Sequence, residues 1–109
     1  MFWKRTPSVA EIDPAETHRL LKSGEIVLID VREPAEFTAE RIDGAISMPL
    51  SRFSPAALAA YDRPVVLSCL SGARSGRAAA MCRAAGRADV RNLRGGLSGW
   101  KAADLPTRR

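Results

Sequence analysis

The stretch Val65-Val66-Leu67-Ser68-Cys69-Leu70-Ser71-Gly72-Ala73-Arg74-Ser75 decides which fold this chain adopts. Its first four residues form the apolar run typical of a strand that is buried on both faces of a sheet. A loop of small residues follows Cys69, and the alanine-rich segment 77–85 then predicts a helix that ends at Gly86. Cys69 is therefore expected where a buried strand ends and a loop leads into a helix.

The rest of the chain continues this alternation of strands and helices. We expect further strands at 8–12, 26–31, 45–49 and 89–93, and further helices at 34–40, 54–60 and 97–103. Another helix begins after Asp13, because Asp13 is a good N-cap and Pro14 fits the first helical position. Such alternation is typical of the α/β class, with an open parallel sheet and helices on both faces.

Length and composition indicate one globular domain. The chain has 109 residues, 46% of them hydrophobic and 27% charged, which is enough for one modest core and not for two. We expect the domain at 8–105, an N-terminal extension at 1–7 that contains Phe2 and Trp3, and a C-terminal tail at 106–109. No apolar run approaches the roughly 20 residues of a transmembrane segment, and the opening residues do not predict a secretory signal. A cytoplasmic location is the default expectation, and the two cysteines would be free thiols there.

The chain is basic, with a formal net charge of +5. Its lysines and arginines are spread along the sequence, without the dense runs and interleaved aromatic residues that are typical of nucleic-acid-binding proteins. We therefore expect no nucleic-acid partner. A positive field instead favours small anionic substrates and acidic partners.

The predicted position of Cys69 gives its sulfur a distinct chemistry. Backbone N–H groups and the positive end of a helix dipole favour a thiolate over a thiol. The same N–H groups can form a nest that holds an anion. Gly72 allows backbone angles that other residues avoid, and Arg74 adds a permanent positive charge. These features predict a nucleophilic cysteine within an anion-binding loop.

The other titratable residues have simpler interpretations. A cysteine that ends an apolar strand is often a small core residue, and only the loop and helix that follow Cys69 favour the reactive interpretation there. Cys82 lies two turns into an apolar helix beside Met81, so we expect it to be buried in the core, with a resolving thiol as the alternative. His18 is expected at the surface, and a cysteine protease would need it to approach Cys69 in space. One histidine and two cysteines are a poor set of metal ligands, so we expect no metal site.

Three segments of the chain resemble motifs of the rhodanese family. Residues 30–37 (DVREPAEF), together with 41–50 (RIDGAISMPL), resemble the first signature of that family. Residues 69–75 (CLSGARS) look like its active-site loop, and 95–100 (GGLSGW) are similar to its closing motif. The three motifs occur in the family's order and cover the chain from the first strands to the last helix.

The resemblance implies a five-stranded parallel sheet and a sulfurtransferase that needs no cofactor. Cys69 would take the sulfane sulfur of thiosulfate or of a persulfide donor and hold it as a persulfide, and a thiol or cyanide would accept it. The residues that would hold the negative outer sulfur are Leu70, Ser71, Gly72, Ala73, Arg74 and Ser75.

Residues outside the loop are expected to support this site. Asp30 and Arg32 would pair with each other or with loop groups, Glu36 would brace the same region, and one of the carboxylates would orient Arg74. Phe37 and Trp100 are expected to pack in the core rather than to contact substrate.

The sequence departs from the family's pattern in two places. Glu40-Arg41 stands where many relatives have Gly-His, which is a tolerable change in a loop. Leu70 and Ser71 are uncharged, whereas some relatives specialised for thiosulfate carry a basic residue there. The second departure favours a low-molecular-weight or protein-bound persulfide as the donor, and a sulfur-relay protein as a partner.

Two other functions share these motifs. Cysteine-dependent phosphatases and arsenate reductases use a similar loop, but usually with five residues between cysteine and arginine, where this chain has the four from Leu70 to Ala73. A tighter ring of amides fits one sulfur better than a tetrahedral oxyanion. The other alternative is a non-catalytic interaction module of the rhodanese type, and the presence of Cys69 argues against it.

Overall fold

The computed structural model describes residues 9–109, so Ser8 and the expected extension at 1–7, with Phe2 and Trp3, lie outside the described residues. Five parallel strands form one sheet in the order β1-β5-β4-β2-β3. Their bounds are β1 Glu11–Ile12, β2 Val27–Asp30, β3 Ile46–Ser47, β4 Val65–Ser68 and β5 Val90–Leu93. The predicted α/β class and the open five-stranded parallel sheet are confirmed.

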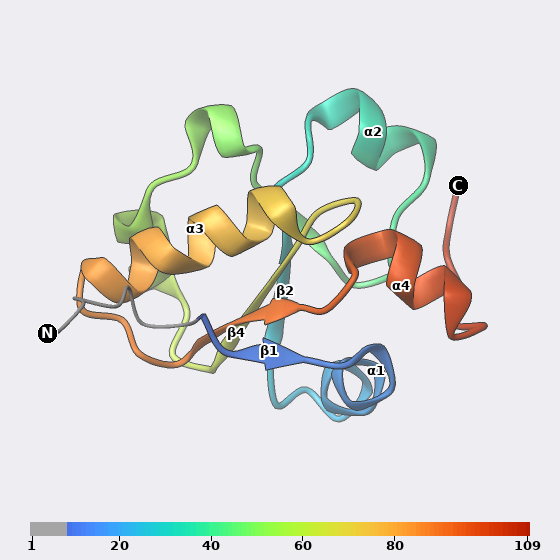
Figure 1. The fold of residues 1–109 in the computed structure, drawn as a ribbon, viewed down its shortest axis with the longest axis horizontal. Coiled ribbons are helices and arrows are strands. Elements are labelled where there is room, and N and C mark those ends of the chain that lie inside the picture. Colours follow the sequence, from blue (N-terminus) through green and yellow to red (C-terminus); the bar gives the residue numbers. More distant parts are fainter. Residues whose placement is uncertain (1–8) are drawn as a thin grey trace, which may run out of the picture.

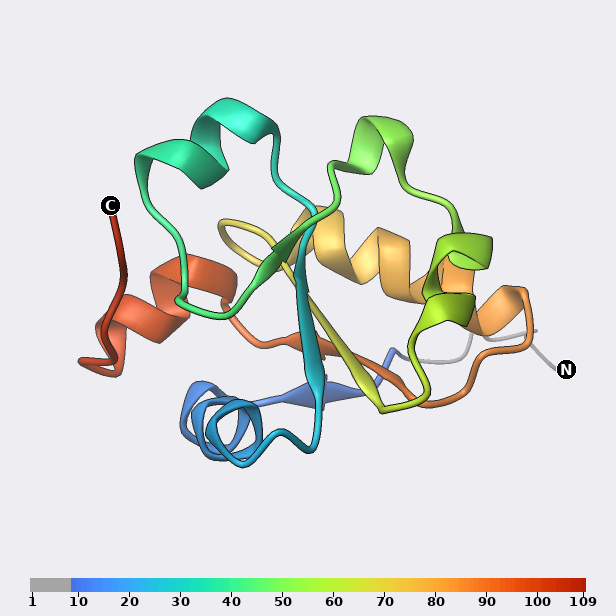
Figure 2. The same ribbon diagram turned by 180° about the vertical axis from the view of Figure 1, so that it is seen from behind.

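Helices cover both faces of this sheet (Figures 1 and 2). The α-helices are α1 Pro14–Lys22, α2 Pro34–Ala39, α3 Ala73–Ala84 and α4 Gly96–Ala102, and two 3-10 helices span Leu50–Arg52 and Pro55–Ala60. α1 and α4 pack on one face, and α3 packs on the other together with the two 3-10 helices.

The central strand β4 is buried along its whole length, as its apolar run predicts. Successive side chains of a strand point to opposite faces, so Val66 packs with Trp100 under α4 while Val65 and Leu67 pack under α3. Cys82, on α3, belongs to the same cluster of buried residues as Val65 and Leu67 and is fully buried. Burial raises the pKa of the Cys82 thiol, which agrees with the predicted role of a small core residue.

Several predicted boundaries are wrong. α3 begins at Ala73 and not at residue 77, because Gly72 adopts a left-handed conformation (φ 103°) that turns the chain directly into the helix. The strand predicted at 45–49 shortens to two exposed residues, Ile46 and Ser47. The helix predicted at 54–60 is a 3-10 helix. These changes leave the order of the elements as predicted.

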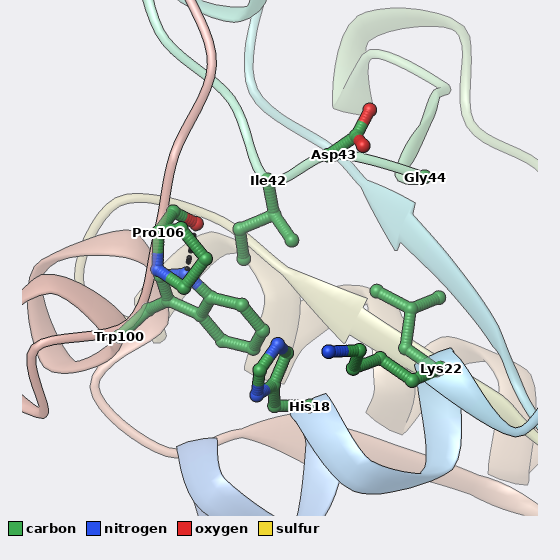
Figure 3. A pocket seen from close by; sticks show the side chains of 8 residues that line it. His18, Lys22, Ile42, Asp43, Gly44, Trp100 and Pro106 are labelled. Carbon is green, nitrogen blue, oxygen red and sulfur yellow. Dashed lines mark hydrogen bonds between the residues drawn. The ribbon is translucent and has the colours of Figure 1, made fainter.

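His18 and Phe37 also differ from expectation. His18 is half-buried rather than at the surface, because its ring packs edge-on against Trp100 at 5.3 Å between centroids. The pair lines a hollow of about 370 Å³ between α1, α4 and the 42–44 loop, and Figure 3 shows the two side chains next to each other. Phe37 is half-buried outside the core clusters, with the guanidinium of Arg41 over its ring at 5.6 Å. Trp100 is buried in the core, as expected.

The last residues of the chain pack against the α2–β3 connection. Arg108 and Arg41 exchange two backbone hydrogen bonds, of 2.7 and 2.9 Å. The Trp100 indole donates to the carbonyl of Pro106 at 2.8 Å, and the Thr107 hydroxyl donates to Glu40 at 2.7 Å. The segment 106–109, expected as a tail, is thus bound to the domain.

Among residues 9–109, no helix has the length and apolar character needed to cross a bilayer.

Candidate active site

The candidate site lies at the carboxyl ends of the central strands. Cys69 follows β4 directly, Asp30 ends β2, and Asn92 lies near the end of β5. Parallel α/β sheets bind ligands at this edge, because loops and helix N-termini converge there.

Backbone and hydroxyl donors surround the Cys69 sulfur. The amide of Gly72 donates to Sγ at 3.0 Å, and the hydroxyl of Ser75 lies 3.3 Å from the same atom. The Cys69 residue as a whole is only 1% exposed. The sulfur is therefore enclosed by polar groups that point toward it, and not by apolar side chains alone.

These donors decide the ionisation of Cys69. Burial by itself raises the pKa of the thiol, because it disfavours the charged form. The Ser75 hydroxyl and the amides of Ser75, Gly72 and Ser71 act in the opposite direction and outweigh it, so the pKa is lowered from its usual value. The geometry favours the thiolate more than an ordinary cysteine environment does.

The early start of α3 brings its N-terminus to the sulfur. Gly72 is the N-cap and has no side chain to cap the first turn, so the amides of this turn stay available for the sulfur. The positive end of the helix dipole points the same way. Ala73, Arg74 and Ser75, which were expected in the loop, belong to this first helical turn.

Arg74 is held by a carboxylate from α2. Its two terminal nitrogens donate to the two oxygens of Glu36 at 2.7 and 3.0 Å. Hydrogen bonds from Arg74 lower the pKa of Glu36 to about 2. The contact expected between Arg74 and one of the carboxylates is present, and it balances the charge that we expected Arg74 to offer at the mouth of the loop.

Asp30 and Arg32 form a buried ion pair that fixes α2. Their side chains are 6% and 4% exposed, and Arg32 donates to Asp30 from Nε and from a terminal nitrogen at 2.8 Å. The same guanidinium donates to the carbonyls of Glu36 and Glu40, at 3.3 and 2.6 Å. The pair therefore anchors α2, the helix that carries Glu36. Through Glu36 it contributes to the position of Arg74.

The first turn of α4 is hydrogen-bonded to the backbone of Cys69 and Leu70 at the start of the loop. The amides of Leu97 and Ser98 donate to the carbonyls of Cys69 and Leu70, at 2.8 and 2.9 Å. Gly96 makes this approach possible, because a Cβ there would lie 2.7 Å from the Leu70 carbonyl oxygen and nearer still to that of Cys69. The predicted closing motif at 95–100 thus has a structural reason to begin with glycines.

The loop residues differ in what they present to solvent. Leu70, Ser71 and Ala73 are exposed, with Leu70 46% exposed, whereas Ser75 is fully buried. A buried Ser75 can reach the Cys69 sulfur and not an external molecule through its side chain. Nothing in the residue types of the loop predicts this difference in exposure.

Asn92 is a residue of this region that we did not predict. It lies in β5, is 5% exposed, accepts from the Ser75 hydroxyl at 2.6 Å and donates to the Gly72 carbonyl at 3.0 Å. Its only signal in the sequence is an amide next to Leu93 in a short strand whose other buried residues, Val90 and Leu93, are apolar.

Comparison with known proteins gives a consistent picture. The family model described as "Rhodanese-like domain" matches residues 13–103. A protein of Allochromatium vinosum named "Sulfurtransferase" is 38% identical over 101 residues, which cover 90% of this chain and 94% of that protein. An uncharacterized Synechocystis protein, slr1261, is 43% identical over 103 residues. They cover 94% of this chain and 58% of the Synechocystis protein, so the chain spans little more than half of that relative.

A solved structure agrees with the fold. The thiosulfate sulfurtransferase of Pseudomonas aeruginosa superposes with a TM-score of 0.81 at 29% identity. The match covers 97% of this chain and 21% of the Pseudomonas chain, so this chain is similar to one part of a larger protein.

Proposed function

The chain belongs to the family of rhodanese-like domains, and on this basis we propose that it is a sulfurtransferase that carries the transferred sulfur on Cys69 as a persulfide. The observation that carries the proposal is the set of donors around Cys69 Sγ, above all the Gly72 amide at 3.0 Å. They favour a thiolate although the residue is buried. A thiolate is the form of cysteine that attacks sulfur.

The reaction has two displacement steps. The Cys69 thiolate attacks the sulfane sulfur of a donor, the S–S bond of the donor breaks, and its electron pair leaves with the departing group, which is sulfite for thiosulfate and a thiolate for an organic persulfide. The outer sulfur now carries the negative charge. An acceptor thiolate or cyanide then attacks this sulfur, and the Cys69 thiolate leaves. Dividing the transfer in this way replaces one difficult step by two easier ones.

The protein stabilises the charge that moves between these atoms. Loop and helix amides from Leu70 to Ser75 would hold the outer sulfur anion as an oxyanion hole holds oxygen. The single histidine of the chain, His18, is not needed as a base in this proposal, because the donors around Cys69 Sγ lower the pKa of the thiol and favour the thiolate. A reducing compartment such as the cytoplasm would keep Cys69 in this state.

Arg74 argues against a phosphatase. A phosphatase arginine must offer its guanidinium to the oxygens of the substrate. Both terminal nitrogens of Arg74 are instead engaged by Glu36, at 2.7 and 3.0 Å. We therefore expect no turnover of an aryl phosphate by this protein.

The donor is proposed to be a persulfide rather than thiosulfate. Leu70 is exposed and uncharged, and the charge of Arg74 is balanced by Glu36. A dianion such as thiosulfate would gain little from this surface, whereas an alkyl persulfide has a smaller charge and an apolar body. The acceptor is a thiol, either of a small molecule or of a relay protein.

Intact mass spectrometry tests the proposal. Brief exposure to an alkyl persulfide should add one sulfur, about 32 Da, and cyanide should remove it. The gain should be absent in Cys69→Ser and retained in Cys82→Ala, because Cys82 is fully buried with a raised pKa. Loading of Cys69→Ser, or no loading of the wild type by either persulfide or thiosulfate, would contradict the proposal.

A further inference from the structure

The hydroxyl of Ser75 has one proton and two acceptors. It lies 2.6 Å from Asn92 Oδ1 and 3.3 Å from Cys69 Sγ. All three residues are almost fully buried, with Ser75 at 0%, Cys69 at 1% and Asn92 at 5% exposure. Because an O–H group donates to one acceptor strongly at a time, the amide oxygen and the sulfur compete for the same proton.

The orientation of the Asn92 amide is fixed by its second contact. Its Nδ2 group donates to the Gly72 carbonyl at 3.0 Å. A flipped amide would place its oxygen against that carbonyl, and two acceptors would then face each other. Oδ1 must therefore face Ser75, where it can only accept.

We propose that Asn92 is a positioning residue that draws the Ser75 proton partly away from Cys69 Sγ and so weakens the hydrogen bond to the sulfur. The inference rests on the proposed role of Cys69 as the nucleophile and concerns how strongly its thiolate is solvated. The short contact of 2.6 Å places the hydroxyl proton closer to Asn92 Oδ1. The longer contact of 3.3 Å gives Cys69 Sγ the weaker hydrogen bond. The hydroxyl then stabilises the thiolate less than it could without Asn92, and the backbone amides of Ser75, Gly72 and Ser71 add their contribution.

This arrangement suits Cys69, because its negative charge moves from Sγ to the outer sulfur when the persulfide forms. A hydroxyl donating fully to Sγ would stabilise the free thiolate and lower its nucleophilicity. After transfer, Sγ is a neutral bridging sulfur and the charge lies on the outer atom, so a strong donor at Sγ would favour the unloaded form. Directing the proton to Asn92 avoids this bias toward the unloaded enzyme.

Removal of the Asn92 amide should therefore have a counterintuitive effect. In Asn92→Leu the Ser75 proton is free to donate to Cys69 Sγ, and the midpoint of Cys69 ionisation should fall by about one pH unit, the value of one hydrogen bond to a charged group. The loop should keep its shape, because the Gly72 carbonyl still accepts from the amide of Gly76 at 2.9 Å. If Asn92 only held the loop in shape, its removal should raise the midpoint of Cys69 ionisation, because a loosened loop would return the thiol toward its ordinary pKa.

The other charged groups near Cys69 stay the same in every variant. The charged groups at this end of the sheet, on or directly after β2, on α2 and α3, and directly after β5, are Asp30, Arg32, Glu36, Arg74 and Arg94, and each has an ion-pair partner. A change in the midpoint consequently reports on Ser75 and Asn92.

The experiment is a set of pH titrations in a Cys82→Ala background, where Cys69 is the single cysteine of the chain. Thiolate absorbance in the ultraviolet, and the rate of alkylation by iodoacetamide, are measured for the background protein, Asn92→Leu, Ser75→Ala and the double variant. Asn92→Leu should lower the midpoint, and in the Ser75→Ala background the same substitution should have no effect, because its action passes through the Ser75 proton.

Two results would overturn the inference: a midpoint that rises or stays unchanged in Asn92→Leu, or an equal fall with and without Ser75. If leucine prevents folding, Asn92→Ala is measured in its place, because it removes atoms without adding any. A separate outcome concerns the proposed function. If Cys69 of the background protein itself titrates like a free thiol, near pH 8.5, the proposed role of Cys69 as a thiolate nucleophile is wrong, independent of the result for Asn92.

Discussion

A methyl group on Gly96 should damage both the stability and the chemistry of the domain. Gly96 has a positive φ of 57°, and a Cβ there would lie 2.7 Å from the carbonyl oxygen and 2.8 Å from the carbonyl carbon of Leu70. These atoms belong to the backbone next to Cys69 and cannot move aside as a side chain does. Gly96→Ala must therefore push α4 and the loop apart.

The magnitude can be separated into two contributions. A left-handed backbone costs an alanine about 1–2 kcal/mol, of which about 0.4–1 kcal/mol is offset by the stiffer unfolded chain. Displacing a packed backbone adds about 1–3 kcal/mol. We expect Gly96→Ala to lower the free energy of unfolding by about 1–5 kcal/mol in total.

Gly24 provides a matched control. It also has a positive φ, of 76°, but a Cβ there would meet nothing within 4 Å. Gly24→Ala should show the backbone cost alone, about 1 kcal/mol or less. The difference between the two variants measures the contact between α4 and the Cys69 loop.

Urea unfolding and sulfur loading together check this reasoning. Folded Gly96→Ala should load sulfur from an alkyl persulfide at least tenfold more slowly than Gly24→Ala, because the hydrogen bonds of Leu97 and Ser98 to the loop are stretched. Equal unfolding free energies for the two variants, with equal loading rates, would refute the idea that α4 fixes the loop.

Three further predictions concern charges around the site. Because the pKa of Glu36 is lowered from 4.5 to about 2, the Arg74 pair contributes stability above pH 4.5 that is lost as the pH falls toward 2. Allowing for side chains that are 30% and 35% exposed, wild type should be more stable than Glu36→Gln by about 1 kcal/mol at pH 7, and equal to it near pH 2 in urea unfolding. A difference independent of pH would contradict this assignment. Asp30→Asn leaves Arg32 buried without a counter-ion and should cost about 3–5 kcal/mol, whereas Glu11→Gln, which breaks an exposed pair with Arg94, should change the unfolding midpoint little. Similar costs for both would show that burial of the pair is unimportant. Leu70→Arg should raise the rate of loading by thiosulfate about threefold to tenfold at low salt, and Met81→Arg, at a residue of similar exposure (44% against 46%) on α3, should not; equal effects would indicate net charge rather than position.

The strand–loop–helix unit around Cys69 was predictable because its signals are local. A continuous apolar run specifies β4, and Gly72 marks the change of direction within three residues of the cysteine. The start of α3 was misplaced because a left-handed glycine can end a loop as well as extend it, and only packing against β5 decides between these. The order of the elements followed from alternation alone.

Contacts between distant residues were harder to predict. The Glu36–Arg74 pair joins residues 38 positions apart, and the sequence predicted only that one of the nearby carboxylates contacts Arg74, without deciding which. Asn92 and Ser75 are 17 positions apart, and neither type of residue signals a partner. His18 was misjudged because its neighbours in sequence are polar, while its neighbour in space is Trp100.

The C-terminal residues reach the site through an indirect route. Thr107 and Lys101 both hold the Glu40 carboxylate, and the carbonyl of Glu40 accepts from Arg32, the residue that anchors α2. Removal of Thr107 by a carboxypeptidase would leave Lys101 as the remaining donor to the Glu40 carboxylate and would weaken the contacts that fix the end of α2, the helix that carries Glu36. Successive digestion products, separated by mass, should then lose sulfur loading on Cys69 before they lose the folded sheet. The chain length at which loading falls would show which C-terminal residues the site requires.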